Sequence, residues 1–249
     1  MADNVTADSL RKAIKRGDVP PVILLHGEEG FYTDLIAREV ETLVAPEDRD
    51  FDLTLLYATD TEPAAVIEAA RRYPMMTSRQ VVIVRELQEG CKPRFTTTAY
   101  LNALAPYVRN PSDSTVLCLC CRGAQAKGAE FTKALKEGNG VALESKKLNE
   151  RVVAQTVADF IAGRGLTADP KALAMLCEFV GTDLSRLYNE VDKLTVTLGP
   201  QARVTPEAVE RNIGVSKEYN NFEFTSALAA HNSARVFKIL RRFAADPKS

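Results

Sequence analysis

Residues 22–44 read VILLHGEEGFYTDLIAREVETLV: an apolar run, a glycine-containing turn and an amphipathic segment, in that order. Four consecutive aliphatic residues at 22–25 predict a strand that is buried on both faces. After the turn at 26–30, apolar residues recur at the spacing of a helix. This segment therefore predicts a strand followed directly by a helix, which is the repeating half of an α/β fold.

The same alternation continues over roughly the first 145 residues. A second strand is predicted at 51–57, where Phe51, Leu53, Leu55 and Tyr57 alternate with polar residues, and further strands at 80–84, 115–121 and 141–143, which are largely apolar. Helical patterns separate these strands. Strands of this kind indicate a parallel sheet that is covered by helices on both faces. We expect about five strands.

After residue 148 the pattern is helical, and no further strand is predicted. Polar residues at 217–221 indicate a linker before two last helices, at 222–230 and 234–244. We therefore expect an α/β domain over residues 1–147, a helical domain over 148–216, and the beginning of another helical domain over 217–249.

The composition excludes several classes of protein. With 32 Lys and Arg against 33 Asp and Glu, the formal net charge is −1, which argues against a basic nucleic-acid-binding tail or a polybasic membrane anchor. The apolar runs are far shorter than the roughly 20 residues that span a bilayer, and residues 1–12 do not resemble a secretory signal. Five cysteines, an odd number, indicate a reducing compartment. We expect a cytoplasmic protein that does not contact a membrane.

The turn after the first strand lies where a phosphate-binding loop would lie, but its residues differ. Such a loop needs a second glycine followed by Lys and Ser or Thr, which hold the phosphates. Counted from Gly27, those places hold Tyr32, Thr33 and Asp34. Arg85 ends the third strand, where a nucleotide hydrolase carries an Asp for Mg²⁺. We therefore expect a degenerate nucleotide site that binds no nucleotide.

Residues 73–79, YPMMTSR, connect a predicted helix to the third strand. Pro74 cannot extend the helix without loss of a hydrogen bond, so Met75 and Met76 fall in a short connection. An apolar pair at such a place is either part of the core or an exposed, flexible plug for a partner. The residues alone leave both interpretations open.

Cys118 and Cys121 form a nominal C-x-x-C motif inside the fourth strand. A strong metal site pairs two such motifs, or one motif with correctly spaced His, and neither pattern is found. We expect these cysteines to pack in the core, and we expect no metal site. The two His, at 26 and 231, do not indicate a hydrolase triad, and no catalytic residue is predicted.

Residues 181–194, GTDLSRLYNEVDKL, predict a well-capped amphipathic helix. Asp183 is placed to cap its first turn, and Glu190 and Lys193 are placed to pair one turn apart. The residues of this segment are explained by helix formation alone and by themselves indicate no further function.

Three blocks together resemble one family: PVILLHGEE at 21–29, YPMMTSRQVVIV at 73–84, and the helix at 181–194. Their order and spacing are similar to those of the delta subunit of the bacterial DNA polymerase III clamp loader, over nearly the whole chain. The resemblance implies an AAA+ domain, which is a P-loop nucleotide-hydrolase-like parallel-sheet domain, followed by a helical lid domain and a helical collar domain. We expect the sequence to be truncated after the opening helices of that collar. The resemblance also implies no working ATP site and no cofactor.

The activity implied by the resemblance is mechanical. In this family, two neighbouring apolar residues before the third strand insert into a pocket on the ring-shaped sliding clamp, and binding there favours an open ring. By position these residues are Met75 and Met76, preceded by Pro74. The best-known pattern has Leu-Phe at the pair, so this chain departs from it. Met can fill an irregular pocket, with less specificity of shape.

The partners implied are the sliding clamp (the beta subunit), the gamma/tau and delta prime subunits in a heteropentamer, and primer–template DNA through that complex. The family is classed with DNA-directed DNA polymerase, a nucleotidyltransferase, because of the holoenzyme. No nucleotidyltransferase site is found in this sequence.

Three alternatives stay open. An active P-loop-type ATPase would bind ATP, and Tyr32–Asp34 argue against it. The delta prime subunit usually carries zinc-ligating cysteines and a Ser-Arg-Cys motif, and neither is found here. A non-replicative interaction scaffold would not bind a sliding clamp.

Overall fold

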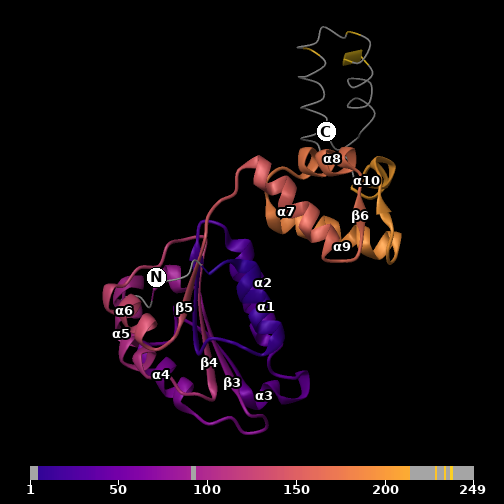
Figure 1. Cartoon of the computed structure of the whole chain (residues 1–249). Helices are drawn as coiled ribbons and strands as arrows, with labels where there is room; N and C mark the ends of the chain where they lie inside the picture. The colour runs from indigo at the N-terminus through magenta and orange to yellow at the C-terminus, as the bar shows by residue number, and fades with distance from the viewer. Residues whose placement is uncertain (1–4, 91–93, 214–227, 229–232, 234–235, 238–249) are drawn as a thin grey trace. The chain divides into compact units, whose positions relative to one another are not determined.

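The computed structural model describes residues 5–90, 94–213, 228, 233, 236 and 237. The chain divides into two compact units, Met1–Lys147 and Leu148–Ser249 (Figure 1). Each unit is described by itself. The two helices predicted at 222–230 and 234–244, and the linker before them, lie almost wholly outside the described residues.

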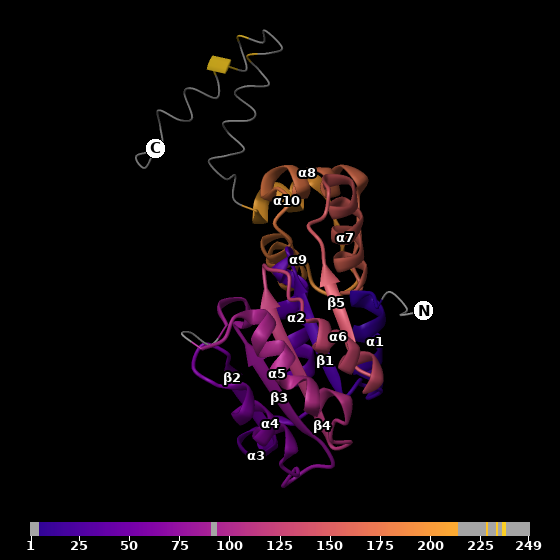
Figure 2. The ribbon, with the colours of Figure 1, turned by 90° about the vertical axis from the view of Figure 1, so that its left-hand side faces the viewer.

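A five-stranded parallel sheet forms the centre of the first unit, in the order β2-β3-β4-β1-β5. Figure 2 shows β2 at one side of this unit and β5 at the other. The expected parallel sheet of about five strands is confirmed. Its strands are β1 (Val22–Gly27), β2 (Leu53–Tyr57), β3 (Gln80–Arg85), β4 (Thr115–Arg122) and β5 (Val141–Ser145).

Helices cover both faces of the sheet (Figure 1). Val81 and Ile83 of β3 belong to the core cluster under α1 and α2, whereas Val82 and Val84 belong to the cluster under α4, α5 and α6. Successive residues of a strand point to opposite faces, which explains why these strands are apolar throughout. The helices are α1 (Ala7–Arg16), α2 (Gly30–Glu41), α3 (Arg49–Asp52), α4 (Pro63–Arg71), α5 (Thr97–Arg109) and α6 (Ala129–Glu137), with 3₁₀ turns at Pro46–Asp48 and Leu87–Glu89.

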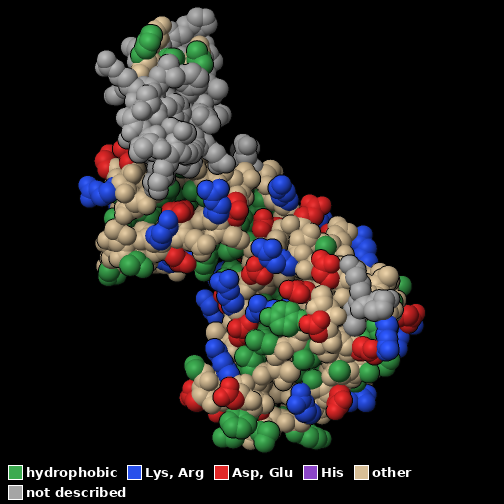
Figure 3. Space-filling model, turned by 180° about the vertical axis from the view of Figure 1, so that it is seen from behind, with side chains coloured by type: hydrophobic (Ala, Val, Ile, Leu, Met, Phe, Trp, Pro, Cys, Tyr) green, Lys and Arg blue, Asp and Glu red, His purple; other side chains and the backbone are tan. Residues whose placement is uncertain are grey.

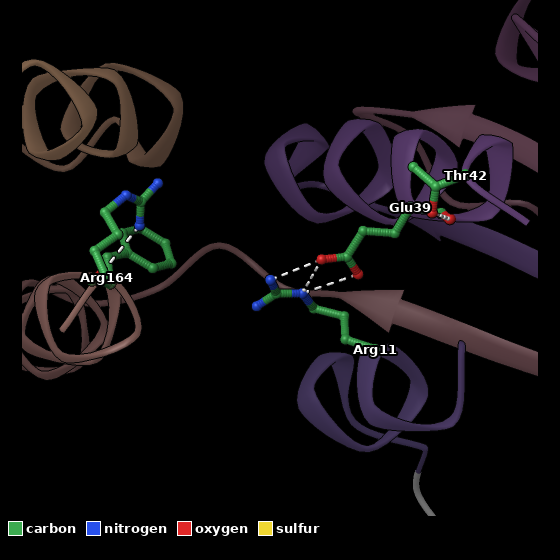
Figure 4. Close-up of polar contacts among 5 residues, drawn as sticks. Arg11, Glu39, Thr42 and Arg164 are labelled. Carbon is green, nitrogen blue, oxygen red and sulfur yellow. Dashed lines mark hydrogen bonds and ion pairs between the residues drawn. The ribbon is translucent and has the colours of Figure 1, made fainter. Parts of the chain in front are cut away.

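A forked ion pair joins α1 to α2. Arg11 donates from Nε and Nη2 to the carboxylate of Glu39, with N–O distances of 2.7–3.0 Å (Figure 4). Charge-assisted pairs of this geometry are the stronger kind. The pair therefore fixes how these two helices lie against each other on the sheet.

The second strand differs from its sequence-based prediction. Phe51, expected in the strand, lies in the four-residue helix α3, and β2 begins two residues later. β2 is an edge strand, and Leu55 and Tyr57 stay 45% and 44% exposed. The alternating pattern was correct for β2 itself but extended too far toward the N-terminus, because α3 turns Asp52 into the interior.

The second unit contains α7 (Glu150–Ala162), α8 (Pro170–Val180), α9 (Leu184–Leu198) and α10 (Pro206–Asn212). It also contains a two-stranded parallel pair, β6 (Thr167–Ala168) with β7 (Arg203–Val204). The prediction of no strand after residue 148 was therefore wrong. A two-residue strand has no periodicity to detect, and these two are brought together only by the packing of the helices between them.

Helix α9 is capped as predicted. The Asp183 side chain accepts a hydrogen bond from the Arg186 amide at 3.0 Å, and Glu190 pairs with Lys193 at 2.7 Å. Within the described part of the chain, every helix is too short or too polar to cross a membrane.

Candidate functional site

The connection between α4 and β3 exposes its apolar side chains. Helix α4 ends at Arg71, and the exposed fractions are 84% for Tyr73, 73% for Met75 and 61% for Met76, while Pro74 is half-buried. Figure 3 shows hydrophobic side chains gathered at the lower end of the α/β unit, the end where this connection lies. Of the two interpretations left open for the methionine pair, the structure excludes packing in the core. We call residues 72–79 the methionine loop.

A buried carboxylate holds this loop from beneath. Asp52, at the end of α3, is 1% exposed. Its oxygens accept hydrogen bonds from the backbone amides of Met75 (2.6 Å), Met76 (3.0 Å) and Thr77 (2.7 Å), and from the Thr77 hydroxyl at 2.9 Å. Three successive amides that converge on one anion fix the backbone there, so the methionine side chains must point away from Asp52.

The environment of Asp52 acts on its pKa in two opposite ways. Burial by itself raises the pKa of a carboxyl, but the hydrogen bonds from Met75, Met76 and Thr77 outweigh it and lower the pKa of Asp52 below its ordinary value of 3.8. The side chain is therefore ionised at neutral pH, which is the form that accepts from all four donors.

Gln80 fixes the region from the other side. Its buried side-chain amide Nε2 lies 3.3 Å from the carbonyl oxygens of both Ala69 and Ala70, 2.9 Å from the Thr115 hydroxyl, and within hydrogen-bonding distance of the Arg72 carbonyl. The last carbonyls of a helix have no partner inside it. Gln80 therefore caps the end of α4 and links it to the first residue of β3.

Sequence reasoning identified the methionine pair but missed Asp52 and Gln80. Asp52 lies 23 residues before Met75 and immediately before a predicted strand. Its inward direction follows from α3, which is too short to leave a helical pattern. The sequence did contain a signal for Gln80: it is a polar residue at the start of an otherwise apolar strand, and a buried polar side chain needs hydrogen-bond partners.

Two backbone amides of the turn at 27–30, and that of the next residue, donate to acceptors within the chain. Gly27 N–H donates to the Ala124 carbonyl (2.8 Å), Glu29 N–H donates to the Ser145 carbonyl (3.2 Å), and the Glu29 carboxylate accepts from the Phe31 amide (2.9 Å). An anion bound at the start of α2 would compete with that carboxylate. Position 27 needs a glycine for a structural reason, because a Cβ there would lie 2.1 Å from the Ser145 carbonyl oxygen.

Arg122, at the end of β4, crosses the same region. Its Nε donates to Asp34 at 2.8 Å, and its side chain is so close to Gly30 that a Cβ there would lie 2.9 Å from the Arg122 Cγ. The guanidinium therefore lies over the first turn of α2, where a phosphate would approach in a working loop, and it is paired with a carboxylate of the chain.

Tyr32, Thr33 and Arg85, the remaining residues of the expected degenerate site, lie on α2 and at the end of β3. Tyr32 is half-buried against Phe31, and Thr33 is buried, its hydroxyl without a hydrogen bond among the described residues. Arg85 forms an ion pair with Glu41 of α2 at 2.5 Å.

The cysteines of β4 pack in the core, as predicted. Cys118 and Cys120 lie on the face toward α1 and α2, with their sulfurs 3.9 Å apart, and Cys121 lies on the opposite face. The two cysteines of the C-x-x-C motif therefore cannot bind one metal ion, because residues three apart in a strand point to opposite sides. Burial raises the pKa of the Cys121 thiol to about 11, which disfavours the thiolate. Among the residues that the structure describes, no cluster of three or more His, Cys, Asp or Glu side chains could hold a metal ion.

These features define the class of the protein. The chain has an α/β domain of the AAA+ type, in which the amides of Gly27, Glu29 and Phe31 at the turn after β1 are bonded within the chain, followed by a helical unit. The fold class expected from the sequence is confirmed.

Comparison with known proteins gives the family. The family model for the delta subunit of DNA polymerase III matches residues 25–146. The DNA polymerase III subunit delta of Bacillus subtilis is 27% identical over 232 residues, which are 92% of this chain and 67% of that protein. The solved structure of the Bacillus subtilis DNA clamp loader delta protein matches with a TM-score of 0.78 and 24% identity, over 96% of this chain and 71% of that chain.

Residues 25–146 thus belong to the DNA polymerase III delta-subunit family, and the resemblance inferred from the sequence blocks is confirmed. The family is that of an accessory clamp-loader subunit in DNA replication. The chain spans about two thirds of the length of its curated relative.

Proposed function

We propose that this protein binds a sliding clamp through Met75 and Met76, positioned by Pro74, and thereby favours an open ring, without hydrolysing ATP itself. Its partners in this role are the clamp, the gamma/tau and delta prime subunits of a heteropentameric loader, and primer–template DNA held by the whole complex. The proposal extends the family assignment to particular residues.

One observation carries the proposal: two adjacent methionines are exposed on a loop whose backbone is held by hydrogen bonds to a buried carboxylate. Burying a Met side chain contributes about 1.5–3 kcal/mol relative to leaving it in water. An exposed apolar pair on an ordered backbone gains that energy on docking and loses little conformational entropy. Such a pair suits a hydrophobic pocket on a partner.

Opening of the ring needs no chemistry at this site. If the pocket on the clamp accepts the methionines better when the ring is open or strained, the difference in affinity shifts the clamp toward that state. Nucleotide plays no part in this step. The internal use of the loop amides at 27–31 and the Arg122–Asp34 ion pair support the absence of ATP binding by this chain.

The test is a titration of the sliding clamp from the same organism without ATP, with the wild type and with Met75→Ala/Met76→Ala. Loss of an interface anchor typically costs 2 kcal/mol or more, so we expect about a thirtyfold weaker Kd for the double variant. Val196→Ala is the matched control, because Val196 is an apolar residue of the second unit that is 86% exposed. Its Kd should equal that of the wild type.

Other outcomes lead to different conclusions. Equal binding by the double variant would move the clamp contact away from the methionine loop. A folded wild type that does not bind the clamp would favour a non-replicative scaffold. Measurable binding of ATP would favour a nucleotide-binding role.

A further inference from the structure

Asp52 accepts a set of hydrogen bonds that the proposed function does not by itself require. Its carboxylate accepts from three consecutive backbone amides, of Met75, Met76 and Thr77, and from the Thr77 hydroxyl. Consecutive amides that converge in this way form a nest, the geometry by which backbone binds anions. Here the anion is a side chain of the same chain. It comes from α3, a segment that touches the loop from 23 residues earlier in the sequence.

The burial of Asp52 couples its charge to the shape of the loop. A carboxylate that is 1% exposed has lost its water, and it tolerates that loss only while the four donors stay in place. If the loop moved, the buried charge would be left without partners. If the charge were removed, the three amides would lose their acceptor. The ionised carboxylate and the backbone of the loop therefore stabilise each other.

The methionines depend on this arrangement for their direction. Met75 and Met76 are mostly exposed, so core packing does little to hold their side chains in place. Their position follows from the backbone, and the backbone of these two residues is bonded to Asp52. We propose that Asp52 is a positioning residue that pre-organises the methionine loop for the clamp, so that clamp affinity depends on this carboxylate although it cannot touch the partner. This inference rests on the proposed function of the loop.

The first arm of the test needs no partner. Hydrogen exchange is measured in the free, full chain for wild type, Asp52→Asn and Asp50→Asn. In Asp52→Asn, an NH₂ group replaces one acceptor oxygen and faces the loop amides, so exchange at Met75–Thr77 should rise at least tenfold while the sheet stays protected. Asp50→Asn removes the same charge from an exposed position of the same short helix and should leave exchange unchanged.

The second arm measures clamp affinity in a double-mutant cycle. We expect Asp52→Asn to weaken the Kd about tenfold and Asp50→Asn to leave it unchanged. In the Met75→Ala/Met76→Ala background, Asp52→Asn should have little further effect, because Asp52 acts through the methionines. A general loss of stability would instead weaken binding by the same factor in both backgrounds, which would overturn the inference.

A milder variant covers the case in which Asp52→Asn does not fold. Thr77→Val keeps the shape of the side chain and removes the hydroxyl, which lies within hydrogen-bonding distance of both the Asp52 carboxylate (2.9 Å) and the Arg79 carbonyl (2.7 Å). It should raise exchange at the loop amides and weaken the Kd in the same direction, by about threefold. Unchanged values for both quantities would contradict the inference.

The two proposals can fail separately. If Met75→Ala/Met76→Ala abolishes binding and Asp52→Asn loosens the loop without changing the Kd, the methionines form the contact and pre-organisation is not needed. If the wild type does not bind the clamp at all, the proposed function fails, and the positioning of the loop for the clamp fails with it, whatever the exchange data show.

Discussion

The Asp52 carboxylate shows how one residue can join segments that sequence reasoning treats separately. It ends a four-residue helix, precedes the edge strand β2, and accepts hydrogen bonds from the methionine loop. Its burial would be unfavourable for an isolated charge, and four donors compensate for it. The hydrogen bonds keep the pKa of Asp52 below 3.8 despite burial.

This lowered pKa predicts a specific dependence of stability on pH. Because the folded protein holds the carboxylate ionised and the unfolded chain takes up a proton first, Asp52 contributes stability above the unfolded pKa of about 3.8. That contribution is lost as the pH falls through the folded pKa. We expect the difference in unfolding free energy between wild type and Asp52→Asn to be constant from pH 7 to about 5 and to shrink below about 4.

Urea unfolding of both proteins over this pH range measures the difference. Other carboxyl groups titrate alike in the two proteins, so they cancel. A difference that stays constant down to pH 3 would show that the hydrogen bonds to Asp52 do not lower its pKa.

At the scale of the elements, the end of α4 and the start of β3 are stabilised by one side chain. Gln80 places its amide among the carbonyls of Ala69, Ala70 and Arg72, and the Thr115 hydroxyl also donates to Ala70 at 2.9 Å. The methionine loop runs between these two elements. The anchoring of both elements limits how far the loop can move.

Gln80→Leu should therefore destabilise the protein. Leucine is similar in size but removes the amide donor that Gln80 provides at the end of α4. The Ala69 and Ala70 carbonyls keep other donors, the Arg72 amide and the Thr115 hydroxyl, whereas the Arg72 carbonyl loses the Gln80 amide. An unsatisfied polar group that is shielded from water costs about 1–3 kcal/mol. We expect the free energy of unfolding in urea to fall by about 2 kcal/mol. Gln125→Leu, at an exposed position of the same unit, should change it by less than about 0.5 kcal/mol. Equal values for the two variants would show that Gln80 does not cap α4.

At the scale of the whole molecule, the first unit contains the sheet, both of its core clusters and the methionine loop with its anchors. The second unit, Leu148–Ser249, has a separate helical core built on residues such as Leu176, Leu187 and Val191. A unit with its own core can fold by itself.

A chain of residues 1–147 should fold and bind the sliding clamp with a Kd within about threefold of that of the whole chain. Circular dichroism checks the fold, and the titration without ATP checks the affinity. A folded fragment that binds more than tenfold more weakly would show that residues 148–249 contribute to the clamp contact.

Several elements were predictable because their cause is local. The apolar strands β1, β3 and β4, the cap of α9 by Asp183 and the placement of the cysteines in the core follow from neighbouring residues. Other features were missed because they arise from contacts between distant segments. The pair β6–β7 joins residues 36 apart, and Phe51 leaves the strand pattern because α3 turns Asp52 inward. The role of the methionine pair, the domain boundaries within 148–249 and the loss of nucleotide binding stay predictions.

Local patterns in the chain were sufficient for the α/β alternation and for the parallel sheet buried on both faces, because periodicity and residue type carry that information directly. The family resemblance also rested on such local blocks. Only the tertiary structure decided that Met75 and Met76 are exposed, that Asp52 holds their backbone, and that Arg122 lies over the start of α2. Burial and hydrogen-bond partners depend on segments that meet only when the chain has folded, and no local pattern records which segments these are.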